Sequence, residues 1–370
     1  MVSNVRPLQK ILFGSPGTGK SYQIRAIATE QLGIELDKTT KTLANTVKTV
    51  FHPEYTYADF MGKLLPQSQG GNIIYKFYPG HFLQILGKAY QGLMHNNGEH
   101  YLLVIDELNR GNASAIFGTV FQLLDREGDH WSSYEVDLSD LELMGLFKEM
   151  KYEPTFSEKD ITIQYKPFQQ FFDDKEQALR DSNPEGTRLA GLLKRSKISI
   201  PPNLSILATI NTSDESIYYL DSAFKRRWDW EYIEAPSLRT KTPEPIRSVQ
   251  LVFGGGEHSL NWEYCIKGIN LFIRSNAQTI RRIEDKQIGW WFIKPENGEV
   301  SLDQVEGKLM FYLWDNVFAK DRRPLEATLN EQLSPTIPIK LITFADFVDY
   351  TEELMQYFHD ILKVKNTDDF

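Results

Sequence analysis

Residues 10–21 read Lys-Ile-Leu-Phe-Gly-Ser-Pro-Gly-Thr-Gly-Lys-Ser and match the pattern G-x-x-x-x-G-K-[ST] from Gly14 to Ser21. A short apolar run, Ile11–Phe13, comes before the glycines, and apolar residues at helical spacing follow over residues 22–32. This order predicts a strand, a glycine loop and a helix, which is the context that separates a phosphate-binding loop from a chance glycine-rich turn. The stretch therefore predicts an α/β fold that binds a nucleoside triphosphate.

Each residue type in this loop has a chemical task. The residues assigned to the phosphates are Gly14, Ser15, Pro16, Gly17, Thr18, Gly19, Lys20 and Ser21. Glycines let backbone N–H groups turn inward around the β- and γ-phosphates, and the helix that follows directs its positive end at the same charge. We expect the Lys20 ammonium to neutralise the β- and γ-oxygens, and the Ser21 hydroxyl to bind Mg²⁺.

The composition is that of an ordinary folded protein. Hydrophobic residues make up 41% of the 370 and charged residues 25%, which excludes a disordered chain. No apolar run approaches the roughly 20 residues of a membrane span, and the N-terminus lacks the apolar stretch of an export signal. Because Cys265 is the only cysteine, an internal disulfide and a thiolate zinc site are excluded, and we expect a cytoplasmic protein. The net charge of −9 excludes a chain that is basic as a whole.

A second predicted strand ends at two consecutive carboxylates. Residues 101–105 are apolar and are followed by Asp106 and Glu107. An open α/β sheet binds its ligand beyond the carboxyl ends of its strands, which is where these two side chains would lie. We expect Asp106 to hold Mg²⁺ through water, and Glu107 to orient and deprotonate the attacking water.

A third predicted strand, residues 204–210, ends at Asn211. An amide at the tip of a strand beside the one that carries Asp106 can reach the γ-phosphate or the attacking water. Farther along, residues 221–228 form a short helical stretch that ends with Arg226 and Arg227. Basic side chains at a helix end can cap its carbonyl groups or reach the phosphate of another subunit.

The chain divides into an α/β core, residues 1–235, and a mostly helical C-terminal part, residues 236–370. Residues 126–197, rich in charge and aromatics, are interpreted as an insertion in the core, with helices at 141–150 and 168–179. The glycines at 254–256 are interpreted as a loop.

Two stretches of the C-terminal part have more specific patterns. Apolar residues at helical spacing over 344–362 predict a final helix, and Thr343 with Asp346 forms a capping-box start. Residues 289–292, Gly-Trp-Trp-Phe, favour packing in the core or lid, with stacking on a nucleotide base as the alternative.

In this order the motifs resemble the AAA+ superfamily, and within it the McrB-like motor subunits of modification-dependent restriction systems. Residues 51–60, Phe-His-Pro-Glu-Tyr-Thr-Tyr-Ala-Asp-Phe, are similar to a segment of that group. Residues 105–112 resemble its extended Walker B motif, with Asn109 and Arg110 after the acids. Residues 208–216 resemble its methionine–asparagine–threonine–alanine–aspartate–arginine–serine signature.

The resemblance implies an AAA+ P-loop NTPase core with a helical lid, assembled as a ring, usually a hexamer, with nucleotide at each subunit interface. It implies that Asn211 is the sensor-1 residue, and that Arg226, with Arg227 as a second candidate, is the arginine finger acting on a neighbouring subunit. Together with Glu107 these form the expected catalytic set. A McrC-like subunit would dock on the ring and supply the nuclease. Either ATP or GTP could be the substrate.

Glu215 stands where the family has arginine, and Ser213 where it has alanine, which alters the charge near the sensor. Only thirteen residues precede Gly14, so we expect target recognition, and contact with DNA, through another subunit of the complex. Two alternatives remain open from the sequence. One is a MoxR-like remodelling ATPase acting on a protein partner, and the other is a nucleotide-binding scaffold that does not hydrolyse.

Overall fold

The computed structural model describes residues 5–157, 160–212, 218–253 and 258–365 of the chain. The chain forms two compact units. Unit 1 comprises Met1–Leu12, Ser21–Ile210 and Glu215–Glu231, and unit 2 comprises Phe13–Lys20, Asn211–Asp214 and Tyr232–Phe370. The glycine loop is therefore grouped with the C-terminal part of the chain.

A five-stranded sheet carries the predicted motifs, in the order β12-β1-β11-β5-β2. Its strands are β1 (Gln9–Gly14), β2 (Thr46–Val50), β5 (Tyr101–Asp106), β11 (Leu204–Asn211) and β12 (Asp229–Tyr232). The β2–β5 and β5–β11 pairs are parallel, with Val50 opposite Asp106 and Ala208 opposite Ile105. Residues 101–105 and 204–210 are all buried, as strands covered on both faces must be. The predicted α/β fold with a parallel sheet is confirmed.

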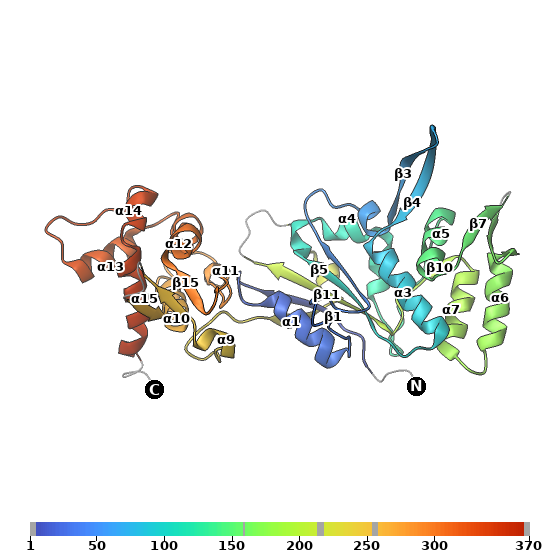
Figure 1. Ribbon diagram of the computed structural model, residues 1–370, viewed down its shortest axis with the longest axis horizontal. Coiled ribbons are helices and arrows are strands. Elements are labelled where there is room, and N and C mark those ends of the chain that lie inside the picture. The colour runs from blue at the N-terminus through green and yellow to red at the C-terminus, as the bar shows by residue number, and fades with distance from the viewer. Residues whose placement is uncertain (1–4, 158–159, 213–217, 254–257, 366–370) are drawn as a thin grey trace. The chain divides into compact units, whose positions relative to one another are not determined.

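Helices of unit 1 pack beside this sheet (Figure 1). α1 (Lys20–Ala26) follows the glycine loop and continues as a π-helical turn to Gln31, before Gly33 with a φ of +65°. α3 (His81–His95) buries its apolar side against β2 and β5. The shorter helices are α2 (Tyr57–Phe60), α4 (Ala113–Phe117), α8 (Ser222–Lys225) and the 3-10 segments Leu108–Arg110 and Gly118–Leu124.

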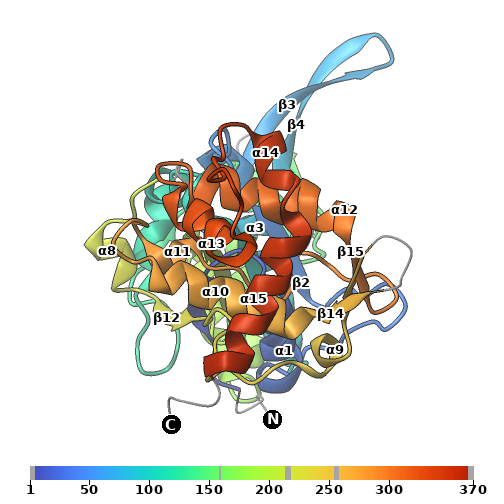
Figure 2. The same cartoon turned by 90° about the vertical axis from the view of Figure 1, so that its left-hand side faces the viewer.

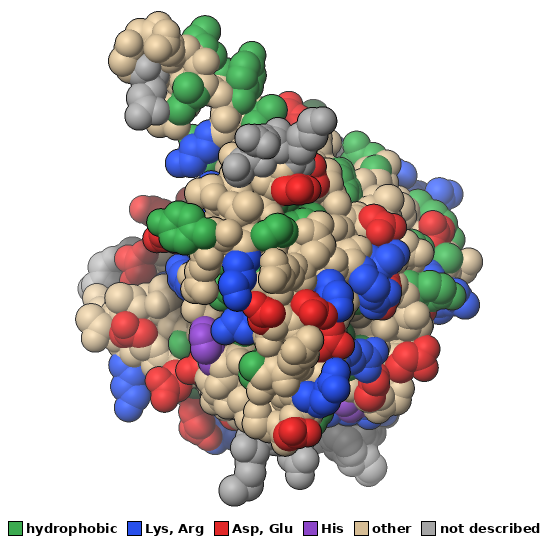
Figure 3. Space-filling model, turned by 90° about the vertical axis from the view of Figure 1, so that its right-hand side faces the viewer, with side chains coloured by type: hydrophobic (Ala, Val, Ile, Leu, Met, Phe, Trp, Pro, Cys, Tyr) green, Lys and Arg blue, Asp and Glu red, His purple; other side chains and the backbone are tan. Residues whose placement is uncertain are grey.

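Strands β3 (Gly62–Gln69) and β4 (Asn72–Pro79) form an antiparallel hairpin that projects from the rest of unit 1 (Figures 1 and 3). Among the described strands, none pairs with either edge of the hairpin. Its apolar side chains are exposed, Ile73 by 71% and Tyr75 by 68%. Each arm of the hairpin is eight residues long.

Residues 126–197 lie within unit 1 and fold into helices and short strands. The elements are β6 (Val136–Asp137), α5 (Asp140–Glu149), β7 (Pro154–Ser157), β8 (Asp160–Ile163), β9 (Lys166–Pro167), α6 (Phe168–Leu179), α7 (Pro184–Lys194) and β10 (Lys197–Ile198). Both predicted helices are present, and α5 begins with a capping box of Ser139 and Glu142. The aromatic residues hold the segment together, because Phe147 packs against Phe168 and Phe172.

The C-terminal part of unit 2 is helical, as predicted, and also contains a three-stranded sheet that the sequence did not predict. Its helices are α9 (Glu244–Arg247), α10 (Trp262–Ser275), α11 (Ile283–Lys286), α12 (Leu302–Gln304), α13 (Arg323–Leu333), α14 (Phe344–Val348), α15 (Thr351–Lys365) and the π-helical segments Val305–Met310 and Leu313–Val317. The sheet consists of β14 (Ser259–Asn261), β13 (Gln250–Val252) and β15 (Glu299–Ser301), in that order. The predicted glycine loop at 254–256 lies outside the described residues.

Helices α10 and α15 pack against each other in the core of unit 2 (Figure 2). The final helix predicted over 344–362 is wrong in one respect, because Asp349 and Tyr350 separate α14 from α15. The Thr351 hydroxyl donates to the Val348 carbonyl at 2.7 Å and so takes the acceptor that a continuous helix would use. The predicted capping box is present, since Thr343 and Asp346 bond each other's backbone N–H groups.

Candidate functional site

The loop between β1 and α1 has the backbone of a tight turn. Gly17 and Gly19 adopt φ values of +75° and +91°, which favour glycine. The Lys20 side chain is buried, and its ammonium donates to the carbonyl oxygens of Gly14 at 2.8 Å and Ser15 at 2.9 Å. These bonds hold the positive charge of Lys20 within the loop, where it can interact with a bound phosphate.

The two predicted carboxylates follow β5. Asp106 is its last residue, and Glu107 adopts a left-handed backbone with a φ of +56°. The Thr209 hydroxyl of β11 donates to Asp106 Oδ1 at 3.1 Å and accepts from the Glu107 N–H at 3.2 Å. Lys48 of β2 forms an ion pair with Asp106 Oδ2 at 2.5 Å. Contacts from β11 and β2 thus orient the Asp106 carboxylate and hold the backbone of Glu107.

Thr209 and Lys48 are contacts that the sequence analysis did not identify. Thr209 is buried and lies two residues before Asn211, so both belong to the same side of β11. That spacing is the signal that could have found it. Asn211 ends β11 and is half-buried. Ser213 and Glu215, where the sequence departs from the family signature, lie outside the described residues.

Arg226 and Arg227 have different surroundings at the end of α8. The Arg227 guanidinium forms an ion pair with Asp125 at 2.6 Å, stacks over the Phe121 ring at 4.2 Å and donates to the Ala223 carbonyl at 2.8 Å. The Arg226 side chain is exposed, and the described residues contribute no ion pair or side-chain hydrogen bond to it. Arg226 is therefore the one presented to solvent.

The segment Gly289–Phe292 lies in unit 2. Trp290 is 6% exposed and belongs to the apolar core of that unit, as the packing interpretation predicted. Trp291 and Phe292 are only partly buried and contact the glycine loop at Gly19 and Gly17. The alternative of stacking on a base stays a prediction.

Comparison with known proteins adds relatives from restriction systems. The chain is 27% identical over 334 residues to the type II restriction enzyme BsuMI component YdiS of Bacillus subtilis, covering 84% of this chain and 80% of that one. It is 26% identical over 226 residues to the type IV methyl-directed restriction enzyme EcoKMcrB subunit of Escherichia coli, covering 60% of this chain and 35% of that subunit. These relatives support the predicted resemblance to McrB-like AAA+ ATPases, and with it the predicted enzyme class, an NTP hydrolase.

No protein-family model matches the chain. Among solved structures, a putative ATPase from Cytophaga hutchinsonii has a TM-score of 0.26 at 14% identity, covering 95% of this chain and 71% of that one. PCH-2 of C. elegans has a TM-score of 0.24 at 13% identity, covering 96% and 62%. Structural similarity at these TM-scores is too weak to support a conclusion about this chain. Among the described helices, none combines the length and hydropathy needed to cross a membrane.

The residues predicted to hold Mg²⁺ fit a magnesium ion that also binds a nucleotide. The described residues contain no cluster of three or more acidic, histidine or cysteine ligands. Mg²⁺ needs none, because it is usually held by one or two carboxylates together with phosphates and water. Ser21 and Asp106 supply hard oxygen donors, and Lys48, whose side chain is 55% exposed, can move off the Asp106 carboxylate.

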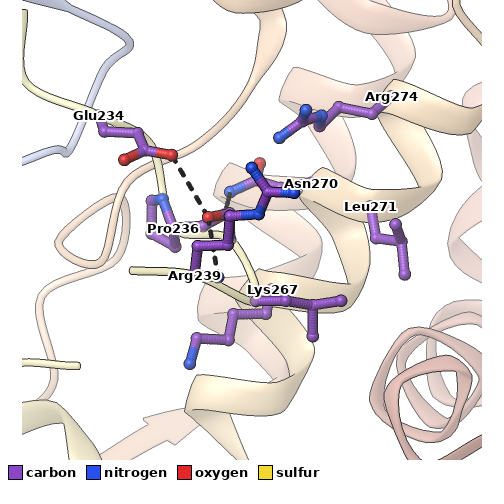
Figure 4. A pocket seen from close by; sticks show the side chains of 9 residues that line it. Glu234, Pro236, Arg239, Lys267, Asn270, Leu271 and Arg274 are labelled. Carbon is purple, nitrogen blue, oxygen red and sulfur yellow. Dashed lines mark hydrogen bonds between the residues drawn. The ribbon is translucent and has the colours of Figure 1, made fainter. Parts of the chain in front are cut away.

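Unit 2 also contains two adjoining pockets. The first, about 330 Å³, carries the cationic side chains of Arg239, Lys267 and Arg274 (Figure 4). The second, about 350 Å³, shares Arg274 and Glu234 with the first; Tyr232, Ala235, Ile283, Glu284 and Gln287 complete its lining. None of the predicted site residues lines either pocket.

The second pocket is connected to the glycine loop. The Ser15 hydroxyl donates to the Glu284 carbonyl, and the Phe13 ring lies 5.3 Å from the Tyr232 ring. The pocket wall and the first residues of the loop are therefore in direct contact.

Proposed function

We propose that this protein is the NTP-hydrolysing motor subunit of a McrBC-like restriction complex, assembled as a ring, with six copies as the expected number, that drives a McrC-like nuclease. The observation that carries this is the sheet order, in which β11 lies between β1 and β5. Three neighbouring strands thus end in the glycine loop, in Asn211 and in Asp106. An amide and a carboxylate at the ends of strands beside the glycine loop favour a hydrolytic site over a loop that only binds nucleotide.

In the proposed site, Lys20 and the backbone of Gly14–Gly19 bind the triphosphate. Ser21 and Asp106 hold Mg²⁺, which when bound neutralises charge that develops on the phosphates. Glu107 orients and deprotonates the attacking water, and Asn211 contacts the water or the γ-phosphate. Because Arg227 is engaged by Asp125, Arg226 is the better candidate for the finger that reaches a neighbouring subunit.

The second pocket of unit 2 is our candidate for the nucleoside. Its contact with the loop through Ser15 and Glu284 supports this, because a bound triphosphate must extend from the loop toward its base. Tyr232 offers a ring, and Gln287 an amide that can bond the edge of a base. ATP and GTP both remain possible substrates.

The names of the relatives favour restriction over the MoxR-like alternative, in which the same site would remodel a protein partner. The division into residues 1–235 and 236–370, a cytoplasmic location, and access to DNA through another subunit also stay predictions.

The test is phosphate release from ATP and from GTP, with and without the product of a neighbouring nuclease gene. We expect hydrolysis of at least one nucleotide, stimulation by the partner, and loss of both in Lys20→Ala. Lys38→Ala, at an exposed lysine, is the matched control and should behave as wild type. Hydrolysis that survives Lys20→Ala would contradict the proposed site, and stimulation by a non-nuclease partner alone would favour remodelling.

A further inference from the structure

The glycine loop is bonded to a distant part of the sequence by its backbone carbonyl groups. The Gly289 N–H donates to the Pro16 carbonyl at 2.9 Å, and the Trp291 N–H donates to the Gly17 carbonyl at 2.8 Å. All four residues belong to unit 2. Two successive carbonyl groups of the loop are therefore held by one short segment, Gly289–Phe292.

The contact leaves no space for side chains. A Cβ atom on Gly289 would lie 2.1 Å from the Gly17 carbonyl carbon and from the Thr18 nitrogen. A Cβ atom on Gly17 would lie 2.5 Å from the Phe292 nitrogen. Real Cβ atoms do not approach backbone atoms this closely, so backbone packs directly on backbone here.

These carbonyl bonds determine where the amides of the loop point. In a planar trans peptide the C=O and the N–H point in opposite directions. When Gly289 holds the Pro16 carbonyl, the N–H of Gly17 must face the other way. When Trp291 holds the Gly17 carbonyl, the same follows for the N–H of Thr18.

Those two amides are available for a ligand. Within the described part of the chain, neither the Gly17 N–H nor the Thr18 N–H has a backbone acceptor. Backbone amides of such a loop are the donors that surround a phosphate, and catalytic or binding groups work best when their direction is set beforehand. Gly289–Phe292 lies on the carbonyl side of both peptides.

We propose that Gly289 and Trp291 are positioning residues of the phosphate site, which aim the Gly17 and Thr18 amides at the bound phosphates. This rests on the proposed function, because it assumes that the loop binds a nucleoside triphosphate. The two residues act through the loop and need not touch the nucleotide.

The segment is itself held from behind by a buried amide. Asn270 of α10 is 1% exposed, and its side chain donates to the Ile288 carbonyl and accepts from the Ile288 N–H, each at 2.8 Å. The same amide donates to the Pro236 carbonyl at 2.9 Å (Figure 4). The peptide immediately before Gly289 is thus fixed to the core of unit 2, so the positioning segment is not a loose loop.

The experiment replaces Gly289 by alanine and uses Gly307→Ala as the matched control, because a Cβ atom on Gly307 meets nothing within 4 Å. Calorimetry measures the Kd of each variant for Mg-ATP, for Mg-GTP and for inorganic tripolyphosphate, which has no base. We expect Gly289→Ala to raise the Kd about tenfold or more for every ligand that the wild type binds, tripolyphosphate included. Gly307→Ala should bind as wild type.

A purely structural role would not single out the phosphates, so the tripolyphosphate measurement is the decisive one. A folded Gly289→Ala variant that binds tripolyphosphate as tightly as wild type overturns the proposal, and so does a loss confined to the nucleotides. Should Gly289→Ala fail to fold, Trp291→Pro serves instead, because proline has no N–H to donate to the Gly17 carbonyl. We then expect a rise in Kd of about threefold to tenfold for the same ligands.

Lys20→Ala separates failure of this inference from failure of the proposed function. If Lys20→Ala loses binding while folded Gly289→Ala or Trp291→Pro retains it, the loop binds phosphate without its positioning segment. If Lys20→Ala binds every ligand as wild type, the loop is not the phosphate site and both proposals fall.

Discussion

The Thr209 hydroxyl donates to Asp106 Oδ1 across 3.1 Å and accepts from the Glu107 N–H across 3.2 Å. One buried side chain of β11 thus bonds both acidic residues at the end of β5. A carboxylate that binds a metal and a neighbour that activates water need fixed directions relative to each other. Thr209 supplies that constraint.

Replacing Thr209 by valine keeps the shape and removes the hydroxyl. We expect a loss of about 1–2 kcal/mol in the free energy of unfolding, because the Glu107 N–H loses its acceptor. We also expect kcat to fall about tenfold or more, as Asp106 and Glu107 lose their common support. Urea unfolding and phosphate release measure the two effects. Thr46→Val, at the start of β2, is the control, and equal turnover of the two variants would contradict the role.

Replacing Glu107 by glutamine keeps the size of the side chain but removes its ability to take a proton. We expect nucleotide binding to remain near wild type while turnover falls by about 10²–10⁴, the usual effect of removing a general base. Calorimetry gives the first quantity and phosphate release the second. Turnover within a few-fold of wild type would show that another group activates the water.

Substitution of the two arginines at the end of α8 should have different effects, one on stability and the other on activity. Arg227→Ala removes an ion pair with Asp125 and a stack on Phe121, so its melting temperature should fall. Arg226→Ala should melt as wild type and lose about 10³-fold or more in turnover if it completes the site of a neighbour.

Mixing the variants tests whether Arg226 acts across a subunit interface. A ring that contains Lys20→Ala chains, whose own sites are inactive, still carries intact Arg226 side chains for its neighbours. Mixtures of Lys20→Ala with Arg226→Ala should therefore recover part of the turnover that each lacks alone. Unchanged inactivity of the mixture would assign Arg226 to its own subunit.

His100 makes the stability of unit 1 depend on pH. Burial, aided by the charge of Arg126, lowers the pKa of His100 from 6.5 to about 4. As the pH falls below 6.5, His100 of the unfolded chain therefore binds a proton, whereas His100 of the folded chain binds it only near pH 4. This contribution to stability is complete above pH 6.5, is lost as the pH falls through that window, and amounts to about 3 kcal/mol.

Urea unfolding between pH 7.5 and pH 4 measures the effect as a difference between variants. His100→Gln, which cannot titrate, should lose less stability than wild type over this range. The exposed His95→Gln is the control and should follow wild type. Parallel curves for all three proteins would mean that the pKa of His100 is the same in the folded and unfolded chains, which would contradict the prediction.

The glycine loop and the acids after β5 could be predicted because their signals are local. A glycine spacing, a lysine and a run of five buried residues each lie within one element and its neighbour. The same holds for the helices at 140–149 and 168–179, whose apolar spacing and caps are short-range. The break between α14 and α15 was missed because a single hydroxyl, that of Thr351, competes with the helix for one carbonyl.

The contact of Gly17 with Gly289 could not be predicted, because backbone hydrogen bonds leave no mark on the choice of side chain except the absence of one. Residues 289–292 look like apolar packing in the sequence, and Trp290 does pack in the core. The difference between Arg226 and Arg227 was likewise hidden, since it depends on Asp125, which lies far away in the sequence.

The grouping of Phe13–Lys20 with Tyr232–Phe370 has a consequence for chimeras between relatives. An exchange made at residue 231 would join the glycine loop of one parent to the segment around Gly289 of the other. Their backbones meet without intervening side chains, so even small shifts in either parent would disturb the fit. Residues 13–20 and 284–292 are best regarded as one heritable module, to be transferred together although they lie far apart in the sequence.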